Sequence, residues 1–424
     1  MKKLILILIT VFVSQVIFSQ KKELKSVDKL IKSNDFIAAS SLLESIQEII
    51  DSSDEKTKAK FYYLNGLSKY QNGDASFENK ISSIESFNLV KSIEQDGSKI
   101  YTEKVENILT NLFNSFVNDS RSALEEKNYD LSYKSLEAAY TVSKKDTLYL
   151  YNAALVATEA KSYDVALDFY EELIRLGYTG ISINYYATEK ESGKEQVFQD
   201  MKSRDFSVDV LTTHISPRDE MAESVEINIL RSIAAIYRSK ENFDKSLEFL
   251  ERAKAINSSD INLILLESNI RWEMGEVDMY QSLISKALEI EPNNVDLIFN
   301  LGVVNADKGN TEAAIEYYDK AIEMDPTYTK AYLNAAALTL EKEGAIIEEM
   351  NSLGMSTADY NRYDELKIDR ENLYKSAIPY LEKVYELENN NLNAVRTLKN
   401  IFSAIGDIES ENKYKEIAAE LEVQ

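Results

Sequence analysis

The sequence predicts an all-α fold, a superhelical solenoid of helix pairs, and two observations support this prediction. Apolar and small residues recur between Ile227 and Pro326 with a period of about 34 residues, which is typical of repeated helix pairs. Only 12 Gly and 4 Pro occur among the 424 residues. A β-sandwich or barrel needs a turn about every 8–12 residues, so the scarcity of turn formers disfavours an all-β fold.

The clearest copy of the repeat spans Val295–Pro326. Gly302 and Ala314 are small where two antiparallel helices would touch, and Gly309-Asn310 supplies the turn between them. The seam is lined at helical spacing by Ile298, Leu301, Tyr318 and Ala321, and Pro326 ends the second helix. The same places are taken one period earlier by Ile264, Ser268, Gly275, Ile284, Ala287 and Pro292, and two periods earlier by Leu230, Ala234, Tyr237, Ser246, Leu250, Ala253 and Ser258.

Weaker copies lie on both sides of these three. Segments that start at Thr147 and near Phe113 each fit a helix pair, and the last unit begins near Leu392. Nearer the N-terminus, YYLNGLSKYQNG at 62–73 fits a first helix and its turn, and Asn34–Ile46 fits a second helix.

This period and these residues resemble the tetratricopeptide repeat (TPR) family. The resemblance implies a right-handed stack of helix pairs, in which the first helix of each pair contributes to a long concave face. It divides the chain into N-terminal TPR-like repeats at 20–180, an insertion at 181–226, and C-terminal TPR repeats at 227–424, with an extended helix pair at 329–391.

The insertion begins where the repeat pattern stops. Alternating β-branched and aromatic residues in Ile181–Thr188, followed by polar residues and a short run to Phe198, predict a small β-hairpin near 181–198. Met201–Leu211 is expected to form a short helix, and the segment around Pro217 a loop. We expect the insertion to serve as a lid on the groove, a dock, or a structural patch.

A second interruption follows Thr329. The residues that match the second helix, Ala377, Leu381 and Val384, come later in the chain than the period requires. The extra length predicts a protruding helical hairpin near 344–376, with Gly354 as the stop of its first helix and Ser356 or Thr357 as the N-cap of the next. Pro379 is expected to kink the long return helix.

The first residues have the pattern of a secretory signal peptide. Lys2 and Lys3 precede the largely apolar run Leu4–Phe18, and the small Ser19 follows. At about 1.5 Å per residue this run is short of a ~30 Å bilayer core. We therefore expect residues 1–19 to be a signal peptide that is cleaved, with an uncleaved anchor as the alternative. No later stretch has the apolar length of a spanning helix, so we expect no membrane span after signal removal.

Composition excludes several kinds of chemistry. The chain has no Cys and one His, so thiolate metal sites, disulfides and sites with two imidazoles are excluded. Its formal charge of −24 argues against nucleic-acid binding. No phosphate-binding loop, zinc-protease or nucleophile-elbow motif occurs, and His214 is expected to lie in a surface loop. We expect no cofactor, no metal and no catalysis.

Candidate partner-binding residues follow from the resemblance. In TPR domains, side chains of successive first helices point into the concave face. At those places this chain has Arg231, Arg238, Asn262, Asn269, Trp272, Phe299, Asn300, Val303 and Lys330. Some TPR domains bind a peptide C-terminus with Lys, Asn, Asn, Lys and Arg. Asn269, Asn300 and Lys330 match three of these places, whereas Leu265 and Asn334 replace two of the three cations.

The leading functional hypothesis is an exported scaffold or adaptor that mediates protein–protein interactions in the cell envelope, in the periplasm or at the outer membrane. Exported TPR proteins of Bacteroidota-type bacteria look similar, and this chain carries their YTG…YYAT and LG-S-ADY-x-x-YD-x-L segments as YTGISINYYAT and LGMSTADYNRYDEL. The alternative is a periplasmic module that binds a small molecule or glycan with the groove and the 181–226 insertion. A third hypothesis is an enzyme that uses carboxylates under that insertion.

Overall fold

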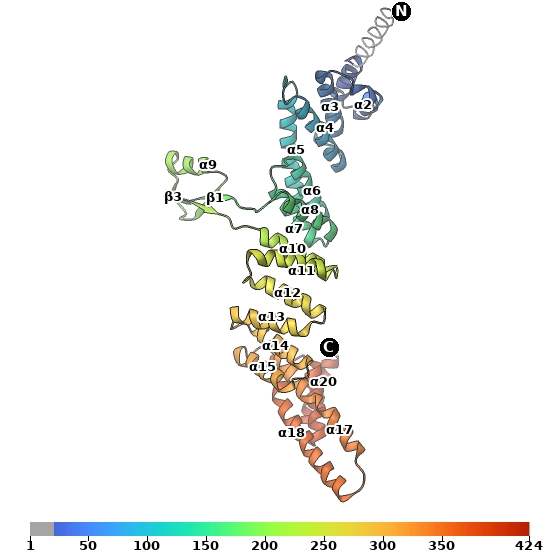
Figure 1. Cartoon of the computed structure of the whole chain (residues 1–424), viewed down its shortest axis with the longest axis vertical. Helices are drawn as coiled ribbons and strands as arrows, with labels where there is room; N and C mark the ends of the chain where they lie inside the picture. Colours follow the sequence, from blue (N-terminus) through green and yellow to red (C-terminus); the bar gives the residue numbers. More distant parts are fainter. Residues whose placement is uncertain (1–20, 424) are drawn as a thin grey trace, which may run out of the picture. The chain divides into compact units, whose positions relative to one another are not determined.

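The computed structural model describes residues 21–423, so the signal peptide predicted at 1–19 lies outside the described residues. The chain divides into two compact units, the first extending to Ile229 and the second starting at Leu230 (Figure 1). The structure is mostly helical, with helix pairs in sequence and one small antiparallel sheet, which confirms the predicted fold class.

The first unit consists of helix pairs followed by the sheet. Residues 21–32 are helical. The helices that follow are α2 (Phe36–Ile50), α3 (Glu55–Tyr70), α4 (Phe77–Ile93), α5 (Thr102–Glu125), α6 (Tyr129–Val142), α7 (Leu148–Glu159) and α8 (Tyr163–Arg175), with a 3-10 turn η1 (Gln71–Gly73). Helix α3 packs on α4, α5 on α6, and α7 on α8. A Cβ added at Gly66 would overlap the ring of Phe87, so the residue must be glycine for α3 and α4 to approach this closely.

The insertion forms a three-stranded sheet. Its elements are β1 (Ile183–Glu189), β2 (Glu195–Phe198), α9 (Met201–Asp205), the π-helix η2 (Phe206–Val210) and β3 (His214–Met221), and the strand order is β2-β1-β3. The predicted hairpin and helix are present, but the predicted loop around Pro217 is wrong because a third strand occupies it. The register shifts beside Pro217, at a bulge opposite β1, where the missing N–H of proline is tolerated.

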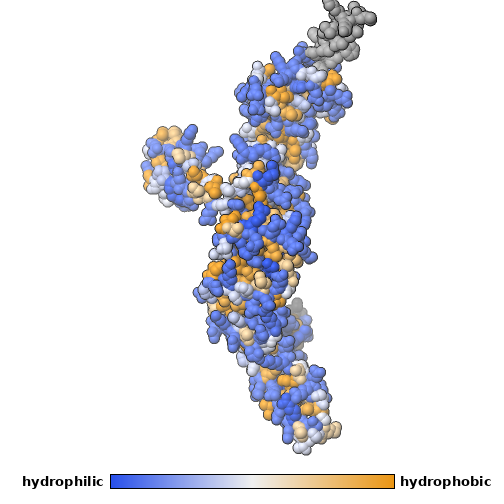
Figure 2. All heavy atoms as spheres, in the orientation of Figure 1, coloured by the Kyte–Doolittle hydropathy of each residue, from blue (hydrophilic) through white to orange (hydrophobic). Residues whose placement is uncertain are grey.

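The prediction of a surface loop position for His214 is also wrong. His214 is buried at the start of β3, where its ring contacts Phe198 edge-on at 5.1 Å and its Nε2 lies 2.9 Å from Gln196 Oε1. The other face of the sheet is exposed, and Val197 is 58% accessible there. Figure 2 shows apolar residues at the surface of this small lobe.

Arg204 fastens α9 to the sheet. Its buried side chain lies over the Tyr185 ring, binds Asp205 at 2.8 Å and pairs with Asp219 of β3.

We expect Arg204→Ala to reduce the local stability of the insertion by about 1–2 kcal/mol. The loss is modest because both aspartates are half-exposed and are hydrated by water once the arginine is removed. Amide hydrogen exchange in β1 and β3 should accelerate, whereas the exposed Lys202→Ala should leave it unchanged. Equal exchange in both variants would contradict this role of Arg204.

The second unit contains the strongest repeats. Its helices are α10 (Glu226–Ser239, which begins just before the division), α11 (Phe243–Ile256), α12 (Ile261–Glu273), α13 (Val277–Ile290), α14 (Val295–Asp307), α15 (Thr311–Met324), α16 (Thr329–Glu341), α17 (Glu343–Ser352), α18 (Thr357–Leu387), α19 (Leu392–Ile405) and α20 (Ile408–Val423). From α11 to α16 each helix packs on the next (Figure 1). Gly309 has a φ of +74°, as the predicted turn requires, and Ile298, Leu301, Tyr318 and Ala321 are buried in the seam.

The C-terminal interruption is a helical hairpin, as predicted, with two differences in detail. Helix α16 packs on α18, and Ala377, Leu381 and Val384 share one core cluster with α16 residues. The long first helix is interrupted at Lys342, so it is built from α16 and α17. Helix α17 ends at Ser352 with Leu353 extended, so Gly354 is not a left-handed cap, whereas Ser356 caps α18 in a capping box with Asp359. Pro379 lies inside α18.

No helix within residues 21–423 combines the length and the apolar character needed to cross a membrane.

Candidate functional site

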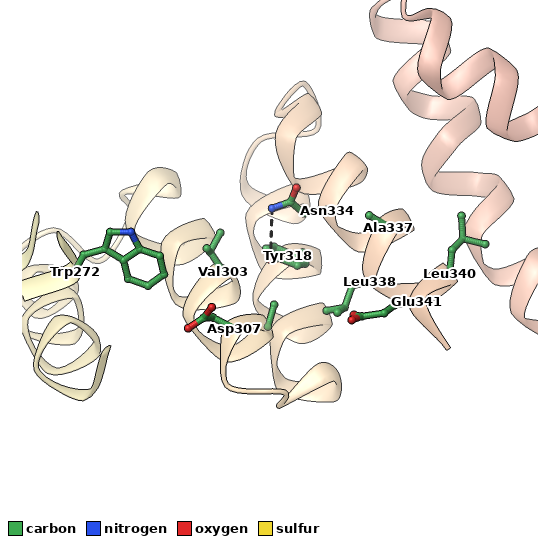
Figure 3. Close-up of a pocket in the computed structure, with 10 residues that line it drawn as sticks. Trp272, Val303, Asp307, Tyr318, Asn334, Ala337, Leu338, Leu340 and Glu341 are labelled. Carbon is green, nitrogen blue, oxygen red and sulfur yellow. Dashed lines mark hydrogen bonds between the residues drawn. The ribbon is translucent and has the colours of Figure 1, made fainter. Parts of the chain in front are cut away.

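The candidate site is an open groove in the second unit, with a volume of about 710 Å³. It is formed by α12, α14, α15 and α16 (Figure 3). Its lining residues are Trp272, Val303, Ala306, Asp307, Tyr318, Asn334, Ala337, Leu338, Leu340 and Glu341. Most of them are apolar or aromatic, so the groove is suited to an apolar side chain.

The repeat period places these side chains together. Trp272, Ala306 and Leu340 are the next-to-last residues of α12, α14 and α16, and each lies one period after the previous one. Each therefore projects from the same place in its repeat. The first helices are parallel members of successive pairs, so their C-terminal ends meet along one edge of the groove.

Tyr318 forms the floor of the groove. Gly302 leaves room for its ring, since an added Cβ would lie 2.5 Å from Tyr318 Cε1. The Tyr318 hydroxyl accepts a hydrogen bond from Asn334 Nδ2 at 3.5 Å (Figure 3). Burial raises the pKa of Tyr318 and the Asn334 bond opposes that rise, so the phenol stays neutral near pH 7 and presents an uncharged floor.

Trp272 both packs in the helix seam and reaches the groove. Its ring lies 5.0 Å from that of Tyr280, and 38% of the residue is accessible. It is the only tryptophan of the chain. Trp272, which the TPR resemblance places on the concave face, therefore contributes to both the helix seam and the groove.

Of the predicted groove residues, Trp272 and Val303 line the groove. Arg238 pairs with Glu273 at 2.6 Å, and Phe299 packs against the rings of Tyr318 and Tyr328. The residues that do not contribute to the lining are Arg231, Arg238, Asn262, Asn269, Phe299, Asn300 and Lys330. Asn262, Asn269 and Lys330 are exposed on α12 and α16.

The sequence did not predict the lining residues at the helix ends, which are Ala306, Asp307, Leu340 and Glu341. A signal for them exists, because Trp272 and Glu273 correspond to Ala306 and Asp307 one period later and to Leu340 and Glu341 two periods later. The period therefore predicts these positions when it is applied about one helical turn beyond Val303 and its counterparts in the neighbouring first helices.

Within the described part of the chain, no group of three or more Asp, Glu or His side chains is arranged to hold a metal ion.

The comparison with protein families agrees with the repeat. The tetratricopeptide repeat family model matches residues 295–328, the copy with the clearest spacing. Among solved structures, a MamA protein is 17% identical with a TM-score of 0.35, covering 47% of this chain and 92% of MamA. YrrB, described as a TPR protein with an unusual peptide-binding site, is 18% identical with a TM-score of 0.34, covering 51% of this chain and 88% of YrrB. A search of curated proteins gave no match. The chain thus contains a tetratricopeptide repeat within a TPR-like array of helix pairs.

Proposed function

We propose that this protein is a non-catalytic scaffold or adaptor that holds a partner protein by a segment lying in the groove. The observation that supports the proposal is the apolar groove itself, built from successive repeats and accessible at Trp272 and Ala337. TPR proteins generally mediate protein–protein interactions, and residues 295–328 match that family.

The shape of the groove favours a peptide segment over a small molecule. Small-molecule sites enclose most of the surface of their ligand. This groove is open and runs across several helices, and its lining residues come from α12, α14, α15 and α16, with none from the insertion. An extended or helical segment that lies across successive repeats fits such a surface.

The proposal is tested with a substitution that places a large side chain in the groove and leaves the buried core unchanged. Ala337 is exposed on α16 within the groove, so Ala337→Trp blocks it, and Ala255→Trp on α11, outside the groove lining, is the matched control. Tagged full-length protein is purified from its own cells, and the proteins that co-elute are identified by mass spectrometry. A partner that is retained by wild type and Ala255→Trp and lost with Ala337→Trp is expected. A partner set that does not respond to Ala337→Trp would contradict the proposal.

We also propose that the protein acts outside the cytoplasm, in the periplasm or at the outer membrane of a Bacteroidota-type cell. The support for export is the signal-peptide pattern of residues 1–19, and the support for the cell type is the pair of segments YTGISINYYAT and LGMSTADYNRYDEL. Cell fractionation with intact-mass measurement tests this, and a mass that begins at Gln20 is expected. A full-length protein in the cytoplasmic fraction would contradict it.

A further inference from the structure

Three carboxylates end three successive first helices. Glu273, Asp307 and Glu341 are the last residues of α12, α14 and α16, each one period after the previous one. Asp307 and Glu341 line the groove, and Figure 3 shows them along one side of it. The C-terminal end of a helix already carries about half a negative charge, so these side chains add to a negative potential instead of offsetting it.

The lysines that follow Asp307 and Glu341 pair with residues of other helices. Lys308 pairs with Asp278, and Lys342 Nζ lies 2.9 Å from Glu312 Oε1. Asp278 and Glu312 lie near the starts of α13 and α15, one period apart, so one ion pair is repeated in two units. Both lysines therefore pair with carboxylates of the second helices, α13 and α15, and not with Asp307 or Glu341.

Within the part of the chain that the structure describes, Glu273 is the only one of the three carboxylates with a cationic partner. Glu273 pairs with Arg238 at 2.6 Å. Among residues 21–423, the carboxylates of Asp307 and Glu341 make neither a hydrogen bond nor an ion pair. The uncompensated negative charge therefore lies at the groove, beside its apolar lining.

We infer that the groove selects a partner segment that carries a basic residue next to an apolar one. The apolar side chain lies on Tyr318 between Trp272 and Leu340, and the Lys or Arg side chain reaches Asp307 or Glu341. The inference rests on the proposed function and adds the chemistry of the partner. Charge complementarity at such a site affects both the affinity and the choice of partner.

The same residues disfavour a partner segment that ends in a carboxylate or is rich in acidic residues. A carboxylate in the groove would face Asp307, Glu341 and the negative ends of α14 and α16.

The test uses three synthetic nonapeptides. All three have Leu, Phe and Leu at the same positions. The two positions between these apolar residues are both Arg in the first peptide, both Gln in the second and both Glu in the third. Binding to the full-length protein is followed by the fluorescence of Trp272, the only tryptophan, which lies in the groove. The Arg peptide is expected to bind about tenfold more tightly than the Gln peptide. The reason is that its Arg side chains form one or two partly solvated ion pairs and lie near the negative C-terminal ends of the helices. The Glu peptide should bind most weakly, and added salt should reduce the preference.

The charge variant is Asp307→Asn with Glu341→Gln. It should bind the Arg and Gln peptides with equal affinity, because the charges that distinguish the two peptides are gone. The matched control is Glu316→Gln with Glu323→Gln, which removes two exposed carboxylates from α15 outside the groove lining and should keep the tenfold preference. The control separates local charge from the net charge of the chain.

Two results would overturn the inference: an Arg peptide that binds no better than the Gln peptide, or no Trp272 response to any of the three. The proposed function is tested separately by the capture experiment. A partner lost with Ala337→Trp would keep the scaffold role even if the peptides showed no charge preference.

Discussion

Replacing Gly302 by valine is expected to lower the free energy of unfolding of the second unit by roughly 3 kcal/mol. A Cβ at this position would lie 2.5 Å from Tyr318 Cε1 and 3.3 Å from the backbone oxygen of Ala314. Tyr318 is 2% exposed and packs on Phe299, so its ring cannot shift toward the groove without losing these contacts, and the Ala314 oxygen belongs to the α15 backbone. The branched side chain must therefore push α14 and α15 apart, which also opens the floor of the groove.

Urea unfolding monitored by the fluorescence of Trp272 measures this loss of stability within the second unit. Gly344→Val is the matched control, because Gly344 is also helical but has nothing within 4 Å of an added Cβ. Helix propensity alone changes the control by only about 0.5 kcal/mol. If both variants unfold at the same urea concentration, the close approach of α14 and α15 is not what requires glycine at 302.

The repeated part of the fold is predictable from sequence because its constraints are local and recur. Gly302, Ala314 and Tyr318 are fixed by the contact between two helices, and the corresponding positions of the neighbouring repeat lie one period away. The insertion has no second copy to check against. Pro217 indicated a loop, and only the pairing of β3 with β1, a contact distant in sequence, shows that it lies at a bulge.

The groove is predictable in part for the same reason. Positions carried over from the TPR family identified Trp272 and Val303, which line it. They did not identify Arg238 as the partner of Glu273, because that pair joins residues on different helices of successive repeats. Asp307 and Glu341 follow the same period, but their place at the groove depends on where their helices end, and helix ends are the least certain feature of a sequence pattern.

Glu94→Ala is the second change with a large expected effect, a loss of about 2–3 kcal/mol in the first unit. The Glu94 carboxylate is buried and accepts hydrogen bonds from Tyr101 N at 3.0 Å, Thr102 N at 2.9 Å and Thr102 Oγ1 at 2.7 Å. Tyr101, the N-cap residue of α5, makes no side-chain cap of its own. Glu94 therefore caps α5 from the end of α4, and alanine would leave these donors without a partner.

The same contacts make the effect depend on pH. Burial alone raises the pKa of Glu94, but the hydrogen bonds from Thr102 and Tyr101 outweigh it, so the net pKa lies below its ordinary value. A lowered folded-state pKa gives a stabilisation that is complete above the unfolded pKa of about 4.3 and is lost as the pH falls through the folded value. The stability difference between wild type and Glu94→Ala should therefore shrink below about pH 4.3.

Hydrogen exchange by mass spectrometry over residues 95–110 tests both statements. At pH 7, Glu94→Ala should accelerate exchange at the start of α5, and Glu103→Gln, which removes an exposed carboxylate from the same first turn, should change it little. Helix unfolding followed by circular dichroism at pH 7 and pH 3 gives the stability difference at each pH. A difference between wild type and Glu94→Ala that is as large at pH 3 as at pH 7 would show that the ionised carboxylate is not what holds α5. Other acidic residues with lowered pKa values titrate in both proteins, so the comparison isolates Glu94.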